Sequence, residues 1–191
     1  LDYLQTLGVN AIELMPINEF EGNDSWGYNP SFFFATDKAY GTKNNYKKFI
    51  DECHKRGIAV IIDMVLNHSF GQSPLVQMYF NPSAGQYGQP TAENPWYNET
   101  CPHPPYCWGY DFDHMSQYTR DFIDRVAEFW LTEFKVDGFR FDFTKGFTNM
   151  LTGGEGWNYN AQRVAILKRF ADVIWEVNPD AYVILEHFTD N

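Results

Sequence analysis

Short apolar runs alternate with longer amphipathic stretches four times along the chain. The runs cover residues 9–17, 58–66, 136–143 and 182–188, and Val, Ile, Leu and Phe are prominent in them. Runs of this length and composition predict buried strands. Because helical stretches separate them, the strands are expected to be parallel and joined by right-handed crossovers.

The stretches between the runs predict helices with one apolar face. Thr42 and Asn160 are the expected N-caps of two helices, Gly57 ends the first of these, and Pro179 follows the second. Residues 1–8 have the pattern of the last turns of another amphipathic helix, so we expect the chain to be a fragment. The apolar stripes are Tyr46, Phe49, Ile50 and Cys53; Phe122, Ile123, Val126, Phe129 and Trp130; and Val164, Leu167, Ala171 and Ile174.

Two connections from a strand to a helix are long, at residues 18–41 and 69–115. Ordinary connections of this kind have about 2–6 residues, so both are expected to be functional. Polar residues gather at the carboxyl ends of the predicted strands, where active sites of (β/α)₈ barrels form. Glycine-rich nucleotide-binding loops are missing from the sequence, which disfavours a doubly wound sheet. We predict a partial (β/α)₈ TIM barrel of residues 1–68 and 116–191, with residues 69–115 as a subdomain over its mouth.

The composition of the chain limits the kinds of partner that it can bind. The chain has 25 acidic and 14 basic residues and a net charge of −11, so no nucleic-acid partner is expected. The sequence has no run of 18 apolar residues, so no membrane-spanning segment is predicted. Aromatic residues make up 18% of the chain. That content fits either a bulky core or a site where flat rings pack on sugars.

Arg140 and Asp142 are the first candidates for chemistry. Alternate side chains of a strand face opposite sides, so Phe139, Phe141 and Phe143 are expected to face the helices. Arg140 and Asp142 then face the barrel interior, where a charged pair is either a structural ion pair or part of a functional site. The Arg140 guanidinium is expected to lower the pKa of Asp142 and keep it ionised, as a carboxylate nucleophile requires.

Further polar side chains follow two other predicted strands. Glu186 ends the last of them, and taken alone it is either a general acid or a solvated acid at a strand end. Adjacent barrel strands lie about 4.8 Å apart, so Asp142 and Glu186 can approach the roughly 5–5.5 Å separation of the carboxyl pair in retaining glycosidases. Asp63, Asn67 and His68 follow residues 58–62 and are candidates to bind a metal or a substrate.

Four segments together resemble the conserved regions of the alpha-amylase family of glycoside hydrolases. Residues 63–68 resemble its Asp-x-x-x-Asn-His motif, and residues 138–146 resemble its Gly-Phe-Arg-x-Asp-x-x-Lys segment. Residues 183–187 resemble the strand that carries its acid/base Glu, and residues 25–28 resemble the loop whose tyrosine stacks under the sugar. Any one of these motifs alone is weak, but four in order along essentially the whole chain are specific.

The resemblance implies a role for each matching residue. Asp142 is implied to be the nucleophile, Glu186 the acid/base, and Arg140 the residue that positions Asp142. The reaction would retain the configuration of the anomeric carbon, because it would pass through a covalent glycosyl-enzyme. The implied substrate-binding residues are Trp26, Tyr28, Asp63, His68, Lys145 and His187.

The resemblance also implies a metal and exposes two departures. Many family members bind calcium beside the inserted subdomain, and Asn67 and Asp111 occupy ligand positions with the oxygen atoms that calcium prefers. No organic cofactor is implied.

Gly146 stands where the family's amylases often have His, which leaves branching, debranching and transfer enzymes open. The family's third acid is expected beyond Asn191, so this chain, which matches the second to fifth barrel strands, is expected to be inactive alone.

The leading hypothesis is a retaining enzyme that hydrolyses α-glucosidic bonds in starch, glycogen or maltooligosaccharides, or transfers α-glucan chains. A second hypothesis is a non-catalytic glucan-binding relative, although both matching carboxylates are retained. A third is a metal-dependent barrel hydrolase that uses Asp63 and His68, although the histidine clusters that such sites favour are missing.

The three cysteines bear on localisation. Cys101 and Cys107 bracket a Pro-rich loop, whereas Cys53 lies in a predicted helix. A Cys101–Cys107 disulfide fits a protein exported to the periplasm, the cell surface or the medium. Three free thiols are the alternative.

Overall fold

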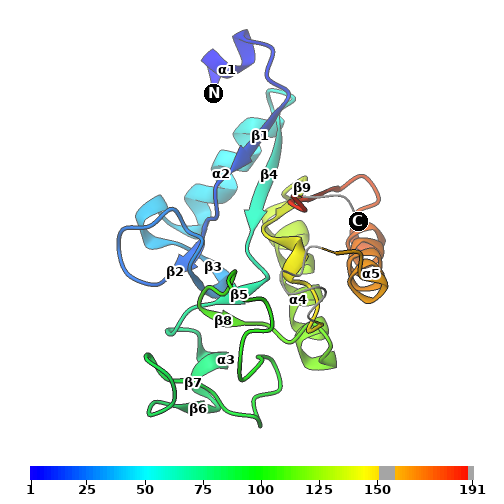
Figure 1. The fold of residues 1–191 in the computed structure, drawn as a ribbon. Coiled ribbons are helices and arrows are strands. Elements are labelled where there is room, and N and C mark those ends of the chain that lie inside the picture. Colours follow the sequence, from blue (N-terminus) through cyan, green and yellow to red (C-terminus); the bar gives the residue numbers. More distant parts are fainter. Residues whose placement is uncertain (151–157, 189–191) are drawn as a thin grey trace.

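Four parallel strands form the central sheet of the computed structural model, which describes residues 1–150 and 158–188. Their order is β1-β4-β9-β10, so each strand after the first is added to the same edge (Figure 1). The register pairs Asp63 of β4 with Arg140 of β9, and Arg140 with Ile184 of β10. The strands are β1 (Ala11–Leu14), β4 (Ala59–Met64), β9 (Gly138–Phe141) and β10 (Tyr182–Leu185).

Helices follow the strands as the sequence predicts. Thr42 caps α2 by accepting a hydrogen bond from Asn45 N, and Asn160 caps α5 by accepting one from Arg163 N. One feature was not predicted: α4 continues into a π-helical turn, η2, which carries the buried Trp130. The bounds are α1 (Asp2–Thr6), α2 (Lys43–His54), α4 (Gln117–Phe129), η2 (Trp130–Phe134) and α5 (Ala161–Val177).

The core lies between the sheet and these helices. Ile62 and Phe139 are fully buried register partners on adjacent strands. The Phe141 ring packs on Phe170 of α5 with centroids 5.1 Å apart, which confirms that Phe139 and Phe141 face the helices. On the outer strand β10, by contrast, Tyr182 is 51% exposed and Leu185 is 40% exposed. This open edge is consistent with a partial (β/α) barrel, which has not closed upon itself.

The observed strands are shorter than the predicted apolar runs. β1, β4, β9 and β10 end at Leu14, Met64, Phe141 and Leu185, respectively. Beyond these residues the backbone leaves the regular ladder. The charged side chains of the candidate site lie within one residue of these ends, so the sheet supports them.

The two long connections carry small structures of their own. The first contains the antiparallel pair β2 (Asn18–Phe20) and β3 (Pro30–Thr36), followed by η1 (Lys38–Tyr40). The second, residues 69–115, lies beyond the end toward which β4 points (Figure 1) and is called the inserted segment below. Its elements, with the strand that leads into it, are β5 (His68–Ser69), α3 (Pro74–Gln77), β6 (Phe80–Asn81), β7 (Gln89–Pro90) and β8 (Tyr110–Asp111).

Two antiparallel pairs and one covalent bond hold the inserted segment. Strand β5 pairs with β8, and β6 pairs with β7. The Cys101–Cys107 disulfide is present, as predicted, and Cys53 is a buried free thiol. None of the helices in the described part of the chain is both long and apolar enough to span a bilayer.

Candidate active site

Arg140 is the centre of a cluster of three carboxylates. Its Nη1 donates to Asp63 Oδ1 at 2.8 Å and to Asp142 Oδ1 at 3.2 Å. Its Nη2 donates to Glu186 Oε1. The structure therefore brings together the two predicted catalytic acids, and it adds Asp63 to the same guanidinium.

Backbone hydrogen bonds place these acids beyond the regular strands. Asp142 N donates to Met64 O at 3.1 Å, and Glu186 N donates to Phe141 O at 3.0 Å. Each acid is thus tied to the neighbouring parallel strand one step past the end of its own. Glu186 Oε2 also accepts a hydrogen bond from Phe143 N at 3.1 Å.

The electrostatics of Asp142 differ from the prediction. Burial, followed by the nearby carboxylates of Glu186 and Asp63, raises the pKa of Asp142 above its ordinary value. Arg140 acts in the opposite direction, but it does not outweigh them. The prediction of a lowered pKa was wrong because one guanidinium is shared among three carboxylates in a site where the Asp142 side chain is only 15% exposed.

Tyr28 connects Asp63 to His68. Tyr28 Oη donates to Asp63 Oδ2 at 2.6 Å, and its backbone oxygen lies 3.0 Å from His68 Nε2. Asn67 Nδ2 lies 3.0 Å from His68 Nδ1, which suits a donor to an unprotonated ring nitrogen. Burial lowers the pKa of His68 to about 4, so the ring is neutral at pH 7 and its Nε2–H donates to Tyr28. Of the predicted substrate-binding residues, Tyr28 therefore contacts a carboxylate of the cluster directly, and His68 contacts Tyr28.

An aromatic wall completes one side of the site, and sequence reasoning did not predict it. The Trp108 ring lies 6.2 Å from the His68 ring and 5.1 Å, edge to face, from the Phe143 ring. Trp108 is 45% exposed. Phe143 has a left-handed φ of 45° and contacts Trp108 and Phe188, so it does not share the helix-facing side with Phe141. The prediction for Phe143 was wrong because β9 ends at Phe141 and the alternation stops there.

The remaining predicted substrate residues are placed differently from one another. His187 Nδ1 lies 2.8 Å from Thr144 Oγ1, next to Glu186. Trp26 is 76% exposed in the loop that carries Tyr28. Lys145 is only 2% exposed, so its contact with an acceptor stays a prediction.

Asn67 and Asp111 offer two oxygens suited to a cation. Phe112 N donates to Asn67 O, which brings the two residues onto neighbouring segments. Asn67 Oδ1 and Asp111 Oδ1 are buried and have no hydrogen-bond partner among residues 1–150 and 158–188. His103 Nε2 lies 3.9 Å from Asp111 Oδ1 and 3.1 Å from Gly146 O, but burial lowers the pKa of His103, so this ring is neutral at pH 7. These oxygens fit a hard cation such as calcium.

A histidine- and carboxylate-based metal centre receives no such support. The described residues contain no group of three His, Cys, Asp or Glu side chains that could hold a metal ion. Asp63 is bound by Tyr28 and Arg140 instead. This arrangement disfavours the hypothesis of a metal-dependent hydrolase built on Asp63 and His68.

Gly146 packs directly against Asn67. A Cβ atom at position 146 would overlap Asn67 Oδ1 and approach the Phe143 ring. A larger residue at position 146 therefore requires the Asn67 side chain to move.

Comparison with known proteins identifies a matching family model and several relatives. The family model described as alpha amylase, catalytic domain, matches residues 1–119. The malto-oligosyltrehalose trehalohydrolase of Saccharolobus solfataricus is 38% identical over 146 residues, covering 74% of this chain and 23% of the relative. The GlgB 1,4-alpha-glucan branching enzyme of Aliivibrio fischeri is 28% identical over 198 residues, covering 99% of this chain and 26% of the relative.

A solved structure agrees with these relatives. Amy13B of Eubacterium rectale matches with a TM-score of 0.76 and 28% identity, covering 98% of this chain and 38% of that chain. The chain spans about a quarter of the length of the curated relatives it matches. The motifs, the partial barrel and the family match agree, and the chain belongs to the alpha-amylase family.

Proposed function

We propose that this chain carries part of the active site of a retaining enzyme that cleaves α-glucosidic bonds in starch, glycogen or maltooligosaccharides. The observation that carries the proposal is the sharing of the Arg140 guanidinium by Asp142 and Glu186. Two carboxylates that contact one planar group lie close together, as the nucleophile and acid/base of a retaining glycosidase must.

The residues have distinct tasks in this reaction. Ionised Asp142 attacks the anomeric carbon, and Glu186 donates a proton to the departing glycosidic oxygen. Glu186 then takes a proton from water or from an acceptor hydroxyl, which releases the sugar from Asp142. Arg140 holds Asp142 and supplies the only positive charge that contacts the three acids among the described residues.

Tyr28 and Trp108 are proposed to contact the sugar, and His68 is proposed to position Tyr28. His68 is only 2% exposed and its Nε2–H donates to Tyr28 O, whereas Trp108 offers a partly exposed ring beside it. Tyr28 is fixed by its hydrogen bond to Asp63. An apolar wall with a few oriented polar groups is the ordinary composition of a small-molecule site.

The test is Asp142→Asn in the full-length protein, with the exposed Asp172→Asn as a matched control. Loss of the nucleophile should lower kcat on an α-1,4-glucan by on the order of 10⁴-fold or more. Asp172 lies on the exposed side of α5, so its variant should keep wild-type turnover. Near-wild-type turnover by Asp142→Asn would refute the assignment.

Chain transfer is a second candidate. The matched branching enzyme supports it, as does Gly146, which stands where the family's amylases often have His. The two reactions differ in what attacks the intermediate: water in hydrolysis, a sugar hydroxyl in transfer. Release of reducing ends in proportion to bond cleavage supports hydrolysis, whereas new branch points without new reducing ends support transfer. Glucan binding with no turnover at all would instead favour the non-catalytic relative.

Calcium is proposed as a structural ion held by Asn67 and Asp111. The support is their two buried oxygens, which lack a hydrogen-bond partner in the described residues. When bound, the ion would tie the inserted segment to the barrel by neutralising Asp111. A chelator should therefore lower the Tm of the full-length protein, calcium should restore it, and Asp111→Asn should abolish both effects. A wild-type Tm that ignores chelator and calcium would count against the ion.

Export from the cytoplasm is proposed on the basis of the Cys101–Cys107 disulfide, because such bonds persist in oxidising compartments. Non-reducing peptide mass spectrometry of the protein from its native source should find these two cysteines linked. Two free thiols would contradict the proposal.

A further inference from the structure

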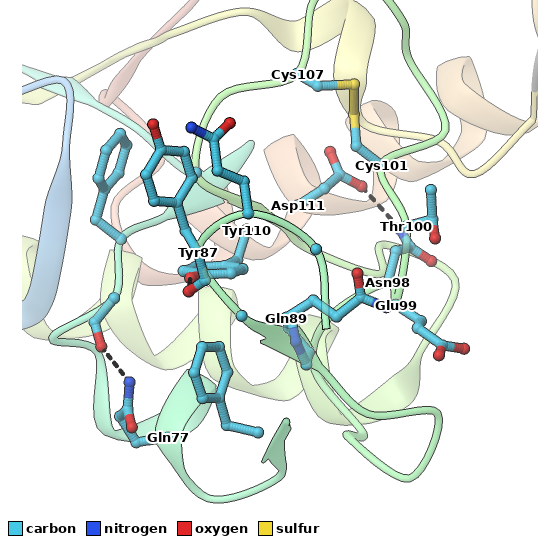
Figure 2. Close-up of a pocket in the computed structure, with 18 of the residues that line it drawn as sticks. Gln77, Tyr87, Gln89, Asn98, Glu99, Thr100, Cys101, Cys107, Tyr110 and Asp111 are labelled. Atoms are coloured by element: carbon cyan, nitrogen blue, oxygen red, sulfur yellow. Dashed lines mark hydrogen bonds between the residues drawn. A yellow bond between two sulfur atoms is a disulfide. The ribbon is translucent and has the colours of Figure 1, made fainter. Parts of the chain in front are cut away.

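A cavity of about 810 Å³ opens within the inserted segment, apart from the carboxylate cluster. Ligand pockets typically enclose about 300–1,000 Å³, so its size suits a small molecule or part of a chain. Figure 2 shows that its walls come from the loop around Tyr87, from β8 with Tyr110, and from the Asn98 to Cys101 stretch. No part of the proposed chemistry uses it.

The lining of the cavity combines exposed rings with amide groups. Tyr87 is 80% exposed, and the Phe80 ring packs edge to face on Tyr110 at 5.7 Å. Gln89 and Asn98 also line the cavity (Figure 2). A pyranose ring has apolar C–H faces and a rim of hydroxyl groups, so flat rings and amides complement both of its surfaces.

Charge limits the class of ligand. The lining includes Glu21 and Glu99, and none of the described residues that line it is Lys, Arg or His. Such a wall repels phosphates, nucleotides and other anions. A neutral polyhydroxylated ligand meets no such penalty.

The walls are fixed before any ligand arrives. The Cys101–Cys107 disulfide closes the loop at one side, and Asn98 Nδ2 donates to Asp111 Oδ2 at 2.8 Å. Tyr110 Oη donates to Tyr87 O at 3.2 Å. Gly88 has a φ of +76°, and a Cβ there would overlap the Phe80 ring. Preorganised walls reduce the ordering that binding would otherwise require.

A continuous set of rings links this cavity to the catalytic centre. Phe70 lines the cavity, and its ring lies 5.9 Å from the ring of His68. His68 contacts Trp108, which in turn contacts Phe143, the residue after Asp142. These contacts place one wall of the cavity next to the residues that flank the carboxylate cluster.

We propose that this cavity binds glucose units of the same α-glucan chain whose bond is cleaved at Asp142, several units away from that bond. The inference rests on the proposed function and adds a remote anchoring site to it. Tyr87 is the principal platform because its ring is the most exposed in the lining. Remote anchoring makes the enzyme favour long chains over short ones.

The experiment compares full-length wild type with Tyr87→Ala on maltooligosaccharides of increasing length and on amylopectin. Tyr118→Ala is the matched control, since Tyr118 is 63% exposed on α4, outside the cavity. Loss of an anchoring ring costs more than about 1 kcal/mol, so KM for long chains should rise about fivefold or more. Short substrates that do not reach the cavity should show unchanged KM, and kcat should be unchanged throughout.

The outcomes separate this inference from the proposed function. Equal KM values for Tyr87→Ala and Tyr118→Ala on long chains, together with an inactive Asp142→Asn, would overturn the anchoring site and leave the function standing. If wild type cleaves no glucan, the function fails, and retardation in amylopectin gels then tests binding alone. Tyr87→Ala should lose retardation that Tyr118→Ala keeps, and equal retardation would overturn the inference.

Discussion

Replacement of Asp142 by Asn should stabilise the protein while it abolishes catalysis. Burial and the carboxylates of Glu186 and Asp63 raise the pKa of Asp142 in the folded state. In the unfolded chain the ordinary pKa of about 3.9 applies. The folded protein therefore holds this proton more tightly, so its stability falls as pH rises from the ordinary pKa through the raised one. Asn has the same shape and carries no charge, so the variant does not lose this stability at high pH.

The magnitude follows from the size of the pKa change. Each unit by which folding raises the pKa costs about 1.4 kcal/mol once the pH exceeds the folded value. Arg140 contacts Asp142 at 3.2 Å and will still find an acceptor oxygen in Asn. In a domain of 150–250 residues 1 kcal/mol shifts Tm by roughly 2–4 °C, and the shift is smaller in a longer protein. We expect an increase of about 2 °C or more at pH 8.

The assay is thermal unfolding of the full-length protein between pH 4.5 and pH 8. The gain of Asp142→Asn over wild type should be largest at pH 8 and should shrink as the pH falls through the raised pKa. Asp172→Asn, which changes an exposed carboxylate, should leave Tm nearly unchanged at every pH. A lower Tm for Asp142→Asn at pH 8, or a gain that grows toward acid, would refute the electrostatic account.

Two further substitutions test the cluster and its support. Arg140→Met should destabilise the protein by about 3 kcal/mol or more, because it leaves one buried and two largely buried carboxylates without their cation; chemical denaturation measures this, and a loss below about 1 kcal/mol would contradict it. The same variant should move the acidic limb of kcat/KM to higher pH, since Arg140 opposes the rise in the pKa of Asp142. Gly146→Ala should cost about 1–3 kcal/mol, because its Cβ would overlap Asn67 Oδ1; an unchanged free energy of unfolding would show that Asn67 moves aside freely.

Much of the fold could be predicted because the apolar pattern repeats with the period of each element. Thr42 and Asn160 cap their helices as expected, because a short polar side chain at that position accepts a hydrogen bond from a free backbone N–H of the first turn. The left-handed turn at Phe143 could not be predicted, because the alternation of side chains tells which side of the sheet a residue faces only while the strand continues. Trp108 was missed for a related reason: a long connection has no period that says where a ring will point.

The candidate site could be assembled from strand ends, but its electrostatics could not. Asp142 and Glu186 follow adjacent strands, so their proximity follows from sheet geometry. The contact of Arg140 with Asp63 depends on the register of β4 against β9, which the sequence does not state. The pKa of Asp142 is raised first by burial and then by the carboxylates of Glu186 and Asp63, and the degree of burial could not be read from the sequence, so the prediction of a lowered pKa was wrong.

The most direct test of the account is the identity of the residue that forms the covalent intermediate. A fluorinated glucosyl fluoride that forms the glycosyl-enzyme quickly and releases it slowly can be incubated with the full-length protein, followed by proteolysis and peptide mass spectrometry. The account predicts one added sugar on Asp142 and none in the Asp142→Asn variant. A sugar attached to Glu186, or efficient turnover with inversion and no labelled peptide, would contradict it.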